Sequence, residues 1–218
     1  MRISGGSFRG RTLRAPTGDL LRPTQDAVRE AAFSTLAAVV PGCSFLDLYA
    51  GTGAVGLEAA SRGAARVAWV ERNPKCLRAL EANAAACLGS PLPPAMRVFR
   101  ADVSAWIRRP PLPPRSVDVV FADPPYVERE GDADSLPALA EAVAASGILA
   151  PVSFFVAEQR AGTPFAVPGG FSLLASRRYG RTSLSLLRRD APEPGRVAGS
   201  ATPDAPEPDR DPPDPAAT

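Results

Sequence analysis

Short apolar runs alternate along the chain with stretches whose apolar residues lie three and four positions apart. The first pattern predicts buried β-strands, and the second predicts helices with one buried face. The predicted strands cover 45–48, 66–71, 96–101, 117–122, 154–158, 171–177 and 182–187. The predicted helices begin at a cap at Thr24, after the glycine turn that follows residue 48, at a cap at Asn73, and at Ser135. This alternation predicts an α/β fold with a mostly parallel sheet, in which the nearly all-apolar strand 117–122 is central.

The N-terminal residues differ from this alternating region. The first fourteen residues contain Arg2, Arg9, Arg11 and Arg14 but no acidic residue, and Gly5-Gly6 separates two short segments that can pair as a hairpin. We interpret this basic hairpin as a flap that faces RNA. The alternative is a solvated edge strand that its charges protect from aggregation.

The C-terminal residues differ in another way. Residues 191–218 contain eight prolines and scarcely any large apolar side chain, so they are predicted to form a disordered tail. The tail carries six acidic and two basic residues, a net charge of −4, which leaves +6 on residues 1–190. We therefore divide the chain into a basic hairpin and helix (1–42), a core (43–190) and an acidic, proline-rich tail (191–218).

Composition narrows the classes of function. The chain has 218 residues, 45% of them apolar, which favours one domain. Three separated cysteines and the absence of histidine give no support to a metal site or a disulfide framework. No apolar leader follows Met1 and no run of eighteen apolar residues occurs, so we expect a cytoplasmic protein without a membrane span. Lys75 is the only lysine, and the many arginines favour a phosphate-rich partner such as nucleic acid.

The candidate chemistry begins at a glycine turn that follows the first predicted core strand. Gly51, Gly53 and Gly56 have the G-x-G-x-x-G spacing of a dinucleotide site, and Glu71 lies twenty residues after Gly51, where a ribose-binding acid is expected. The spacing alone therefore predicts a nicotinamide dinucleotide.

Asp47 argues against that cofactor. It lies inside the apolar strand, four residues before Gly51, where its carboxylate would repel a pyrophosphate. S-adenosylmethionine has an ammonium and a sulfonium and no phosphate, so Asp47 with Gly51 and Gly53 suits it better. Glu71 is then expected at the ribose hydroxyls, and Asp102, after the third strand, near the adenine amino group. Alternatively, Asp47 caps the following helix.

A second motif, Asp123-Pro124-Pro125-Tyr126, follows the fourth predicted core strand. Two prolines hold the backbone extended and remove two N–H donors, so rigid carbonyl acceptors face the crevice. Asp123 and the Pro124 carbonyl can accept the two hydrogens of a base amino group while Tyr126 stacks on the ring. These residues are candidates for catalysis of methyl transfer to an exocyclic nitrogen, in which positioning does most of the work.

Several motifs together closely resemble those of the RsmD family. They are Arg9-Gly10-Arg11, Arg22-Pro23-Thr24, Val28-Arg29-Glu30, the loop at 47–56, Ser61-Arg62-Gly63-Ala64, Asp123-Pro124-Pro125-Tyr126 and Arg178-Tyr179-Gly180. The resemblance covers residues 1–189. It implies a Rossmann-like class I methyltransferase fold over residues 1–190, with a seven-stranded, mostly parallel sheet whose last strand is antiparallel. It also implies S-adenosylmethionine as cofactor and guanine N2 of 16S ribosomal RNA, in free RNA or a small-subunit assembly particle, as acceptor.

The resemblance also implies site residues beyond those argued above. It adds Tyr49, Ala50, Arg72 and Val103 to the cofactor site and no metal. Its expected RNA contacts are Arg2, Arg9, Arg11, Arg22, Arg29, Arg177, Arg178 and Arg181. We expect a monomer. The acidic tail departs from the compact family pattern.

Three other functions fit parts of the sequence. A DNA adenine or cytosine amino-methyltransferase shares the Asp-Pro-Pro-Tyr chemistry. A non-catalytic RNA-binding assembly factor would keep the fold without turnover. A nicotinamide-dependent oxidoreductase agrees with the glycine spacing but not with Asp47.

Overall fold

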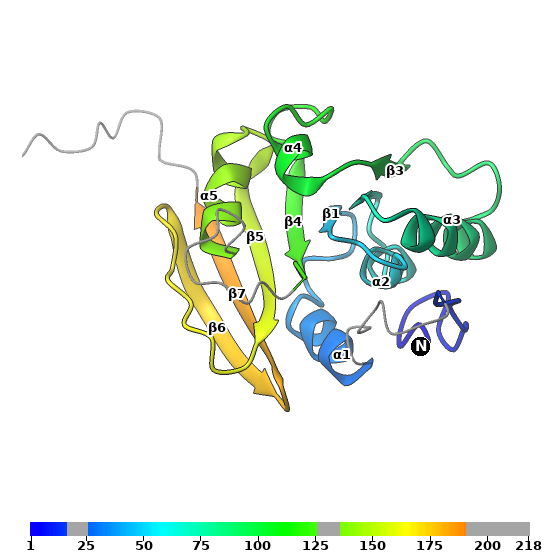
Figure 1. Cartoon of the computed structure of the whole chain (residues 1–218), viewed down its shortest axis with the longest axis horizontal. Helices are drawn as coiled ribbons and strands as arrows, with labels where there is room; N and C mark the ends of the chain where they lie inside the picture. The colour runs from blue at the N-terminus through cyan, green and yellow to red at the C-terminus, as the bar shows by residue number, and fades with distance from the viewer. Residues whose placement is uncertain (17–25, 126–135, 191–218) are drawn as a thin grey trace, which may run out of the picture.

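One seven-stranded sheet organises the computed structural model, which describes residues 1–16, 26–125 and 136–190 (Figure 1). The strands are β1 (Ser44–Leu48), β2 (Arg66–Glu71), β3 (Met96–Arg100), β4 (Val117–Ala122), β5 (Leu149–Arg160), β6 (Phe171–Tyr179) and β7 (Thr182–Asp190). The helices are α1 (Asp26–Thr35), α2 (Ala54–Ser61), α3 (Pro74–Leu88), α4 (Val103–Ile107) and α5 (Leu136–Ala145). The predicted α/β class is therefore confirmed.

The strand order contains a topological switch point, where the chain stops adding strands on one side of β1 and begins to add them on the other. The order is β3-β2-β1-β4-β5-β7-β6, so the chain moves outward from β1 to β3 and then returns to add β4 on the other side of β1. Strands β1 to β5 are parallel, and β7 pairs antiparallel with both β5 and β6. The predicted seven-stranded, mostly parallel sheet is confirmed. In such sheets ligands bind beyond the carboxyl ends of the strands at the switch point, here between β1 and β4.

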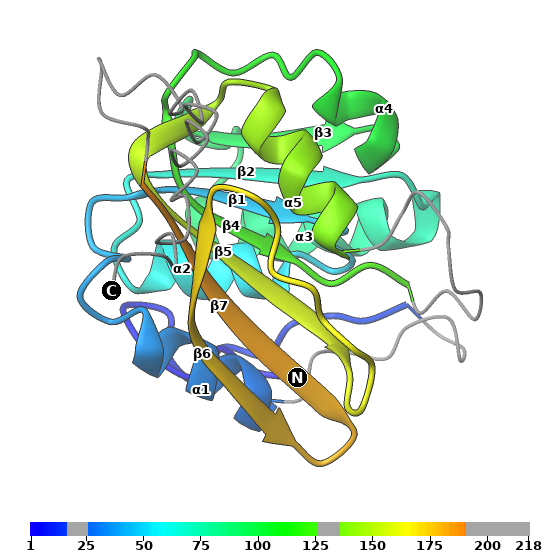
Figure 2. The same cartoon turned by 90° about the vertical axis from the view of Figure 1, so that its left-hand side faces the viewer.

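Helices cover both faces of the sheet. Side chains from α1, α2 and α3 share one apolar core with the sheet, and side chains from α4 and α5 share the other. Figure 2 shows α5 in front of the sheet and α2 behind it. Strand β1 contributes Phe45 to the first core and Leu46 and Leu48 to the second, because successive side chains of a strand point to opposite faces. Asp47 therefore shares the face of α2.

Strands β6 and β7 run two and three residues beyond their predicted ends, and three other elements differ more. Strand β5 begins at Leu149 rather than 154, because the strand continues through Pro151 at an irregularity in its pairing with β4. Helix α4 was not predicted, since five residues are too few to display helical periodicity. Helix α1 ends at Thr35 instead of continuing to Pro41, although Leu36 and Val40 beyond it are still buried.

The N-terminal segment, residues 1–16, pairs with itself and docks on α2. Arg2 and Thr12 form an antiparallel bridge, so the predicted hairpin is confirmed as a short pairing. The backbone N–H groups of Ser4 and Gly5 each donate to the Glu58 carboxylate over 2.8 Å. The side chains of Ile3 and Leu13 are buried in the core. The segment is therefore part of the domain and not a free edge strand.

A buried ion pair holds this junction together, and it corrects the prediction for Arg29. The Arg29 side chain is fully buried, its Nε lies 3.2 Å from Glu58 Oε2, and its Nη2 also pairs with Asp26. A guanidinium enclosed in this way cannot contact RNA. Burial by itself would raise the pKa of the Glu58 carboxyl, but hydrogen bonds from Ser4 and Arg62 and the charge of Arg29 lower it overall.

Within the described residues, no helix is long and apolar enough to cross a membrane.

Replacing Glu58 tests the role of this junction. We expect Glu58→Ala to lower the free energy of unfolding by about 3 kcal/mol or more, because it leaves the buried Arg29 guanidinium without its main partner. Urea denaturation monitored by circular dichroism measures the change. Glu30→Ala, which removes an exposed carboxylate from α1, is the matched control and should change stability by less than about 0.5 kcal/mol. Equal effects of the two substitutions would contradict the proposed importance of the pair.

Candidate functional site

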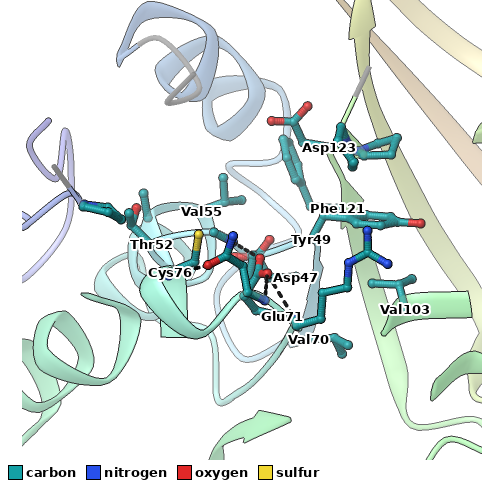
Figure 3. A pocket seen from close by; sticks show the side chains of 18 of the residues that line it. Asp47, Tyr49, Thr52, Val55, Val70, Glu71, Cys76, Val103, Phe121 and Asp123 are labelled. Carbon is teal, nitrogen blue, oxygen red and sulfur yellow. Dashed lines mark hydrogen bonds between the residues drawn. The ribbon is translucent and has the colours of Figure 1, made fainter. Parts of the chain in front are cut away.

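A cavity of about 360 Å³ opens at the carboxyl ends of the central strands, where the strand order reverses. Figure 3 shows Thr52 and Cys76 on one side, Phe121 and Asp123 on the other, and Asp47 and Glu71 between them. The glycine turn, the end of β2 and the residues after β4 all contribute to its lining. The two motifs singled out in the sequence therefore meet in one cavity.

The turn that follows β1 needs unusual backbone geometry. Tyr49, Gly51 and Gly53 all have positive φ values, of 58°, 55° and 79°. Glycine adopts such values without penalty, but Tyr49 does so at a cost, and residues of this kind are common at functional sites. Gly56 has a different reason to be glycine, because a Cβ atom there would lie 2.1 Å from Trp69 Nε1. The third glycine thus permits close contact between α2 and the sheet.

Asp47 caps α2 and also lines the cavity. Its side chain lines the cavity, and its Oδ2 accepts the backbone N–H of Gly56 over 2.8 Å, in the first turn of α2. The N-cap residue of α2, Gly53, has no side chain to serve this purpose, so Asp47 caps the helix from the neighbouring strand. Burial raises the pKa of the Asp47 carboxyl to about 7, and the negative charge of Glu71 contributes to the increase.

Glu71, the last residue of β2, fixes the glycine turn through its carboxylate. Its Oε2 accepts the N–H of Gly51 over 2.8 Å, and its Oε1 accepts the N–H groups of Arg72 and Asn73 over 2.8 and 2.7 Å. A carboxylate has about four acceptor positions, so Oε2 keeps about one for a ligand.

These bonds decide what kind of ligand the turn can hold. In a dinucleotide site the free amides of the glycine turn face a pyrophosphate. Here the N–H of Gly51 binds Glu71, the N–H of Gly56 binds Asp47, and the N–H of Gly53 binds the carbonyl of Ala50. Two carboxylates stand where a dinucleotide site requires neutral donors. The site therefore favours a cationic ligand over a phosphate.

Asp102 makes two contacts within the protein that the sequence did not predict. Its Oδ1 accepts the N–H of Ala105 over 3.0 Å and caps α4, and its Oδ2 pairs with Arg72 Nη1 over 2.9 Å. The Asp102 side chain is not part of the cavity lining, whereas its neighbours Ala101 and Val103 are. The carboxylate thus links the ends of β2 and β3.

The Asp-Pro-Pro motif lies where the sequence placed it. Asp123, Pro124 and Pro125 line the cavity directly after β4, next to the buried side chain of Phe121. Tyr126, which we expect to stack on a base, lies outside the described residues. The site therefore offers the Asp123 carboxylate and extended proline backbone on the side opposite Cys76.

Some lining residues were not predicted. Asn73 is predicted only as the cap of α3, and Thr52 and Cys76 are predicted in no cofactor role, although Thr52 lies between Gly51 and Gly53 and Cys76 lies in the first turn of α3. Their signal was proximity to the ends of β1 and β2. The N-terminal segment also reaches the cavity, through Met1, Ala15 and Pro16. No local pattern could have revealed that contact, because it depends on how residues 1–16 dock on α2.

The remaining predicted residues divide by exposure. Tyr49, Ala50, Gly51 and Arg72 line the cavity, and Gly53 supports it from below as the start of α2. Arg2, Arg9 and Arg11 are exposed on the N-terminal segment, and Arg177, Arg178 and Arg181 are exposed on the β6–β7 hairpin. Arg22 lies outside the described residues. Contact of these arginines with RNA remains a prediction.

Acidic and cysteine side chains within residues 1–16, 26–125 and 136–190 form no group of three or more that could hold a metal ion.

Comparison with known proteins gives consistent matches along most of the chain. A family described as "conserved hypothetical protein 95" matches residues 1–188. Ribosomal RNA small subunit methyltransferase D of Escherichia coli K12 is 34% identical over 193 residues, which are 88% of this chain and 91% of that protein. YlbH of Bacillus subtilis 168 is 30% identical over 87% of this chain and 99% of its own length. The structure of yhhF from Escherichia coli has a TM-score of 0.74 at 32% identity, covering 88% of this chain and 99% of that one.

Proposed function

Because this chain belongs to the RsmD family, we propose that it transfers a methyl group from S-adenosylmethionine to guanine N2 in 16S ribosomal RNA. The observation that carries this proposal is the pair of carboxylates, Asp47 and Glu71, that occupies the amides of the glycine turn. The named relative from Escherichia coli is a methyltransferase of small-subunit ribosomal RNA, which supports RNA as the class of substrate.

The residues of the cavity fit S-adenosylmethionine. Asp47 lines the cavity and would bind the ammonium group, and the remaining acceptor position of Glu71 Oε2 would bind a ribose hydroxyl. Ala101 and Val103 line the wall after β3 and would contact the adenine ring, and Asp102 between them remains the candidate for the adenine amino group. Tyr49 and Arg72 complete that side of the cavity.

The chain's own residues prepare the acceptor. Bound S-adenosylmethionine supplies a methyl group activated by its sulfonium. Asp123 and the Pro124 carbonyl would accept hydrogen bonds from the guanine amino group, which turns the nitrogen lone pair away from the ring and toward the methyl carbon. Asp123 would then hold the proton that the amino nitrogen releases. Tyr126 is proposed to stack on the base after it has left the RNA stack.

The setting of the reaction follows from the substrate. Ribosomal RNA and small-subunit assembly particles are cytoplasmic in bacteria, so we place the enzyme there. We propose that the enzyme acts as a monomer. We propose that residues 1–190 form the methyltransferase domain; residues 191–218, for which the sequence predicts a tail, lie outside the described residues.

The protonation of Asp47 makes cofactor binding depend on pH. A carboxyl whose pKa is about 7 is largely protonated at pH 5.5 and must lose its proton to bind an ammonium. We therefore expect the affinity for S-adenosylhomocysteine to rise by about tenfold per pH unit below 7 and to level off near 7. Calorimetric titrations between pH 5.5 and 7.5 at constant ionic strength measure it. Asp47→Asn should bind weakly and without this slope, and a slope that is equal in the variant would refute the role of Asp47.

Replacing Asp123 tests the acceptor side. We expect Asp123→Ala to reduce kcat by about 100-fold or more, because the amino group loses a positioning acceptor, while the affinity for S-adenosylhomocysteine stays within twofold. The assay follows tritiated methyl transfer to small subunits that lack the modification. Glu141→Ala, which removes an exposed carboxylate of α5, is the control and should retain full activity.

The identity of the labelled nucleoside identifies the substrate. Digestion of the labelled ribosomal RNA should yield N2-methylguanosine. In a parallel assay with DNA as acceptor, labelled N6-methyladenine or N4-methylcytosine would support the DNA amino-methyltransferase instead. Cofactor binding without transfer to ribosomal RNA or to DNA would support the assembly factor.

A further inference from the structure

A second hollow, the basic groove, lies beside the cofactor cavity. Its lining consists of Arg14, Ala15 and Pro16 from the N-terminal segment and Lys75, Arg78, Ala79 and Ala82 from α3. Ala15 and Pro16 also line the cofactor cavity, so the two hollows share a wall. The N-terminal segment and α3 lie side by side along this boundary (Figure 1).

One face of α3 lines the groove with two cationic residues and two alanines. Lys75, Arg78, Ala79 and Ala82 stand at the first, fourth, fifth and eighth positions of a helical stripe, so all four face the same side. The two alanines leave room between the helix and the N-terminal segment. Lys75 and Arg78 are exposed at the edge of that space.

A buried asparagine fixes the opposite rim. Asn83 of α3 is 2% exposed, and its amide makes paired hydrogen bonds with the backbone of Arg14, accepting from the N–H over 2.8 Å and donating to the carbonyl over 3.0 Å. The same amide nitrogen donates to the carbonyl of Thr52 in the glycine turn over 3.0 Å. The position of Arg14 is therefore tied to both α3 and the wall of the cofactor cavity.

The charge of the groove is of one sign. Arg14, Lys75 and Arg78 contribute three cations, and the described lining residues include no carboxylate. Among the described residues none of the three cations takes part in an ion pair. Other arginines of the chain, such as Arg29, Arg62 and Arg72, are held by carboxylates. The groove thus has three cations without a carboxylate partner among the described residues, and it lies between α3 and a backbone segment that Asn83 holds against that helix.

We propose that the basic groove binds backbone phosphates of the RNA strand that carries the target guanine. This inference rests on the proposed function, since it assumes an RNA acceptor. A strand that delivers a base to the cavity must pass over its rim, and its phosphates are the anions that necessarily accompany the base. Arginine and lysine bind such phosphates without regard to sequence, so the groove positions the strand and does not select the base.

Neutralising the groove gives the first test. We compare the wild-type chain with Arg14→Gln/Lys75→Gln/Arg78→Gln, using filter binding of unmodified small subunits at several salt concentrations. Each lost phosphate contact lowers the slope of log affinity against log salt by about 0.7, so we expect a decrease of up to about 2 and binding weakened by about tenfold or more. KM for the subunit should rise while kcat at saturation stays within twofold.

A matched triple variant controls for the loss of three positive charges. Arg66→Gln/Arg109→Gln/Arg115→Gln removes exposed arginines that lie at the start of β2, after α4 and before β4, where they do not line either hollow. It should keep the wild-type affinity and salt slope. Equal losses in the two triple variants would overturn the proposal, because the effect would then be one of net charge.

The single lysine provides a second test on the wild-type chain. Lys75 is the only lysine of the sequence, so acetylation of lysine, followed by mass spectrometry, reports on the groove alone. We expect small subunits to slow acetylation of Lys75 by about fivefold or more, as a phosphate contact shields the amine. S-adenosylhomocysteine alone should not protect it. Protection by S-adenosylhomocysteine to the same extent would overturn the proposal and assign the groove to the cofactor.

Different results would overturn the proposed function and the proposed role of the basic groove. If the wild-type chain neither binds nor methylates ribosomal RNA, the proposed function fails and the groove proposal fails with it. If the wild-type chain methylates RNA but the groove variant behaves as the control variant does, only the groove proposal is overturned. Binding of S-adenosylhomocysteine by both triple variants verifies that their cavities are intact.

Discussion

The structure depends on two carboxylates that satisfy the backbone of the glycine turn. Asp47 and Glu71 accept the N–H groups of Gly56 and Gly51, each over 2.8 Å, and so hold the turn, α2 and the end of β2 in one arrangement. Amides that are already bonded cannot cradle a pyrophosphate, and the negative charges beside them attract a cation. The same interaction therefore stabilises the local fold and selects the ligand. A turn with the spacing of a dinucleotide site thus becomes a site for S-adenosylmethionine.

The N-terminal segment connects this cavity to the surface that would meet RNA. Glu58 anchors residues 4 and 5 on α2, and Asn83 anchors Arg14 on α3, so both ends of the segment are fixed to the helices that flank the glycine turn. Met1, Ala15 and Pro16 consequently form part of the cavity wall. Binding of a strand along the segment would act directly on the wall of the cofactor cavity, without any need for a distant change in structure.

Local patterns in the sequence were sufficient for the elements and for much of the site. Periodicity placed β1 to β4 and α3, and the ends of parallel strands must meet at one edge of the sheet, which brought Asp47, Glu71 and Asp123 together. The errors came from tertiary contacts that no local pattern encodes. Arg29 was expected to contact RNA, but its side chain is buried against Glu58. The contacts of Asp102 with Arg72 and with the start of α4 were likewise not predicted, and its contact with adenine remains a prediction. The contribution of Met1, Ala15 and Pro16 to the cavity wall could not be predicted for the same reason.

The central claim is that the glycine turn binds a cationic methyl donor and not a dinucleotide. Its most direct test is the melting temperature of the full chain at pH 7.5, measured with S-adenosylmethionine, S-adenosylhomocysteine or NADH at equal concentrations. The account predicts that the first two ligands raise the melting temperature and that NADH leaves it unchanged, because a ligand stabilises only the state to which it binds. An increase with NADH and none with the two methyl-donor ligands would contradict it.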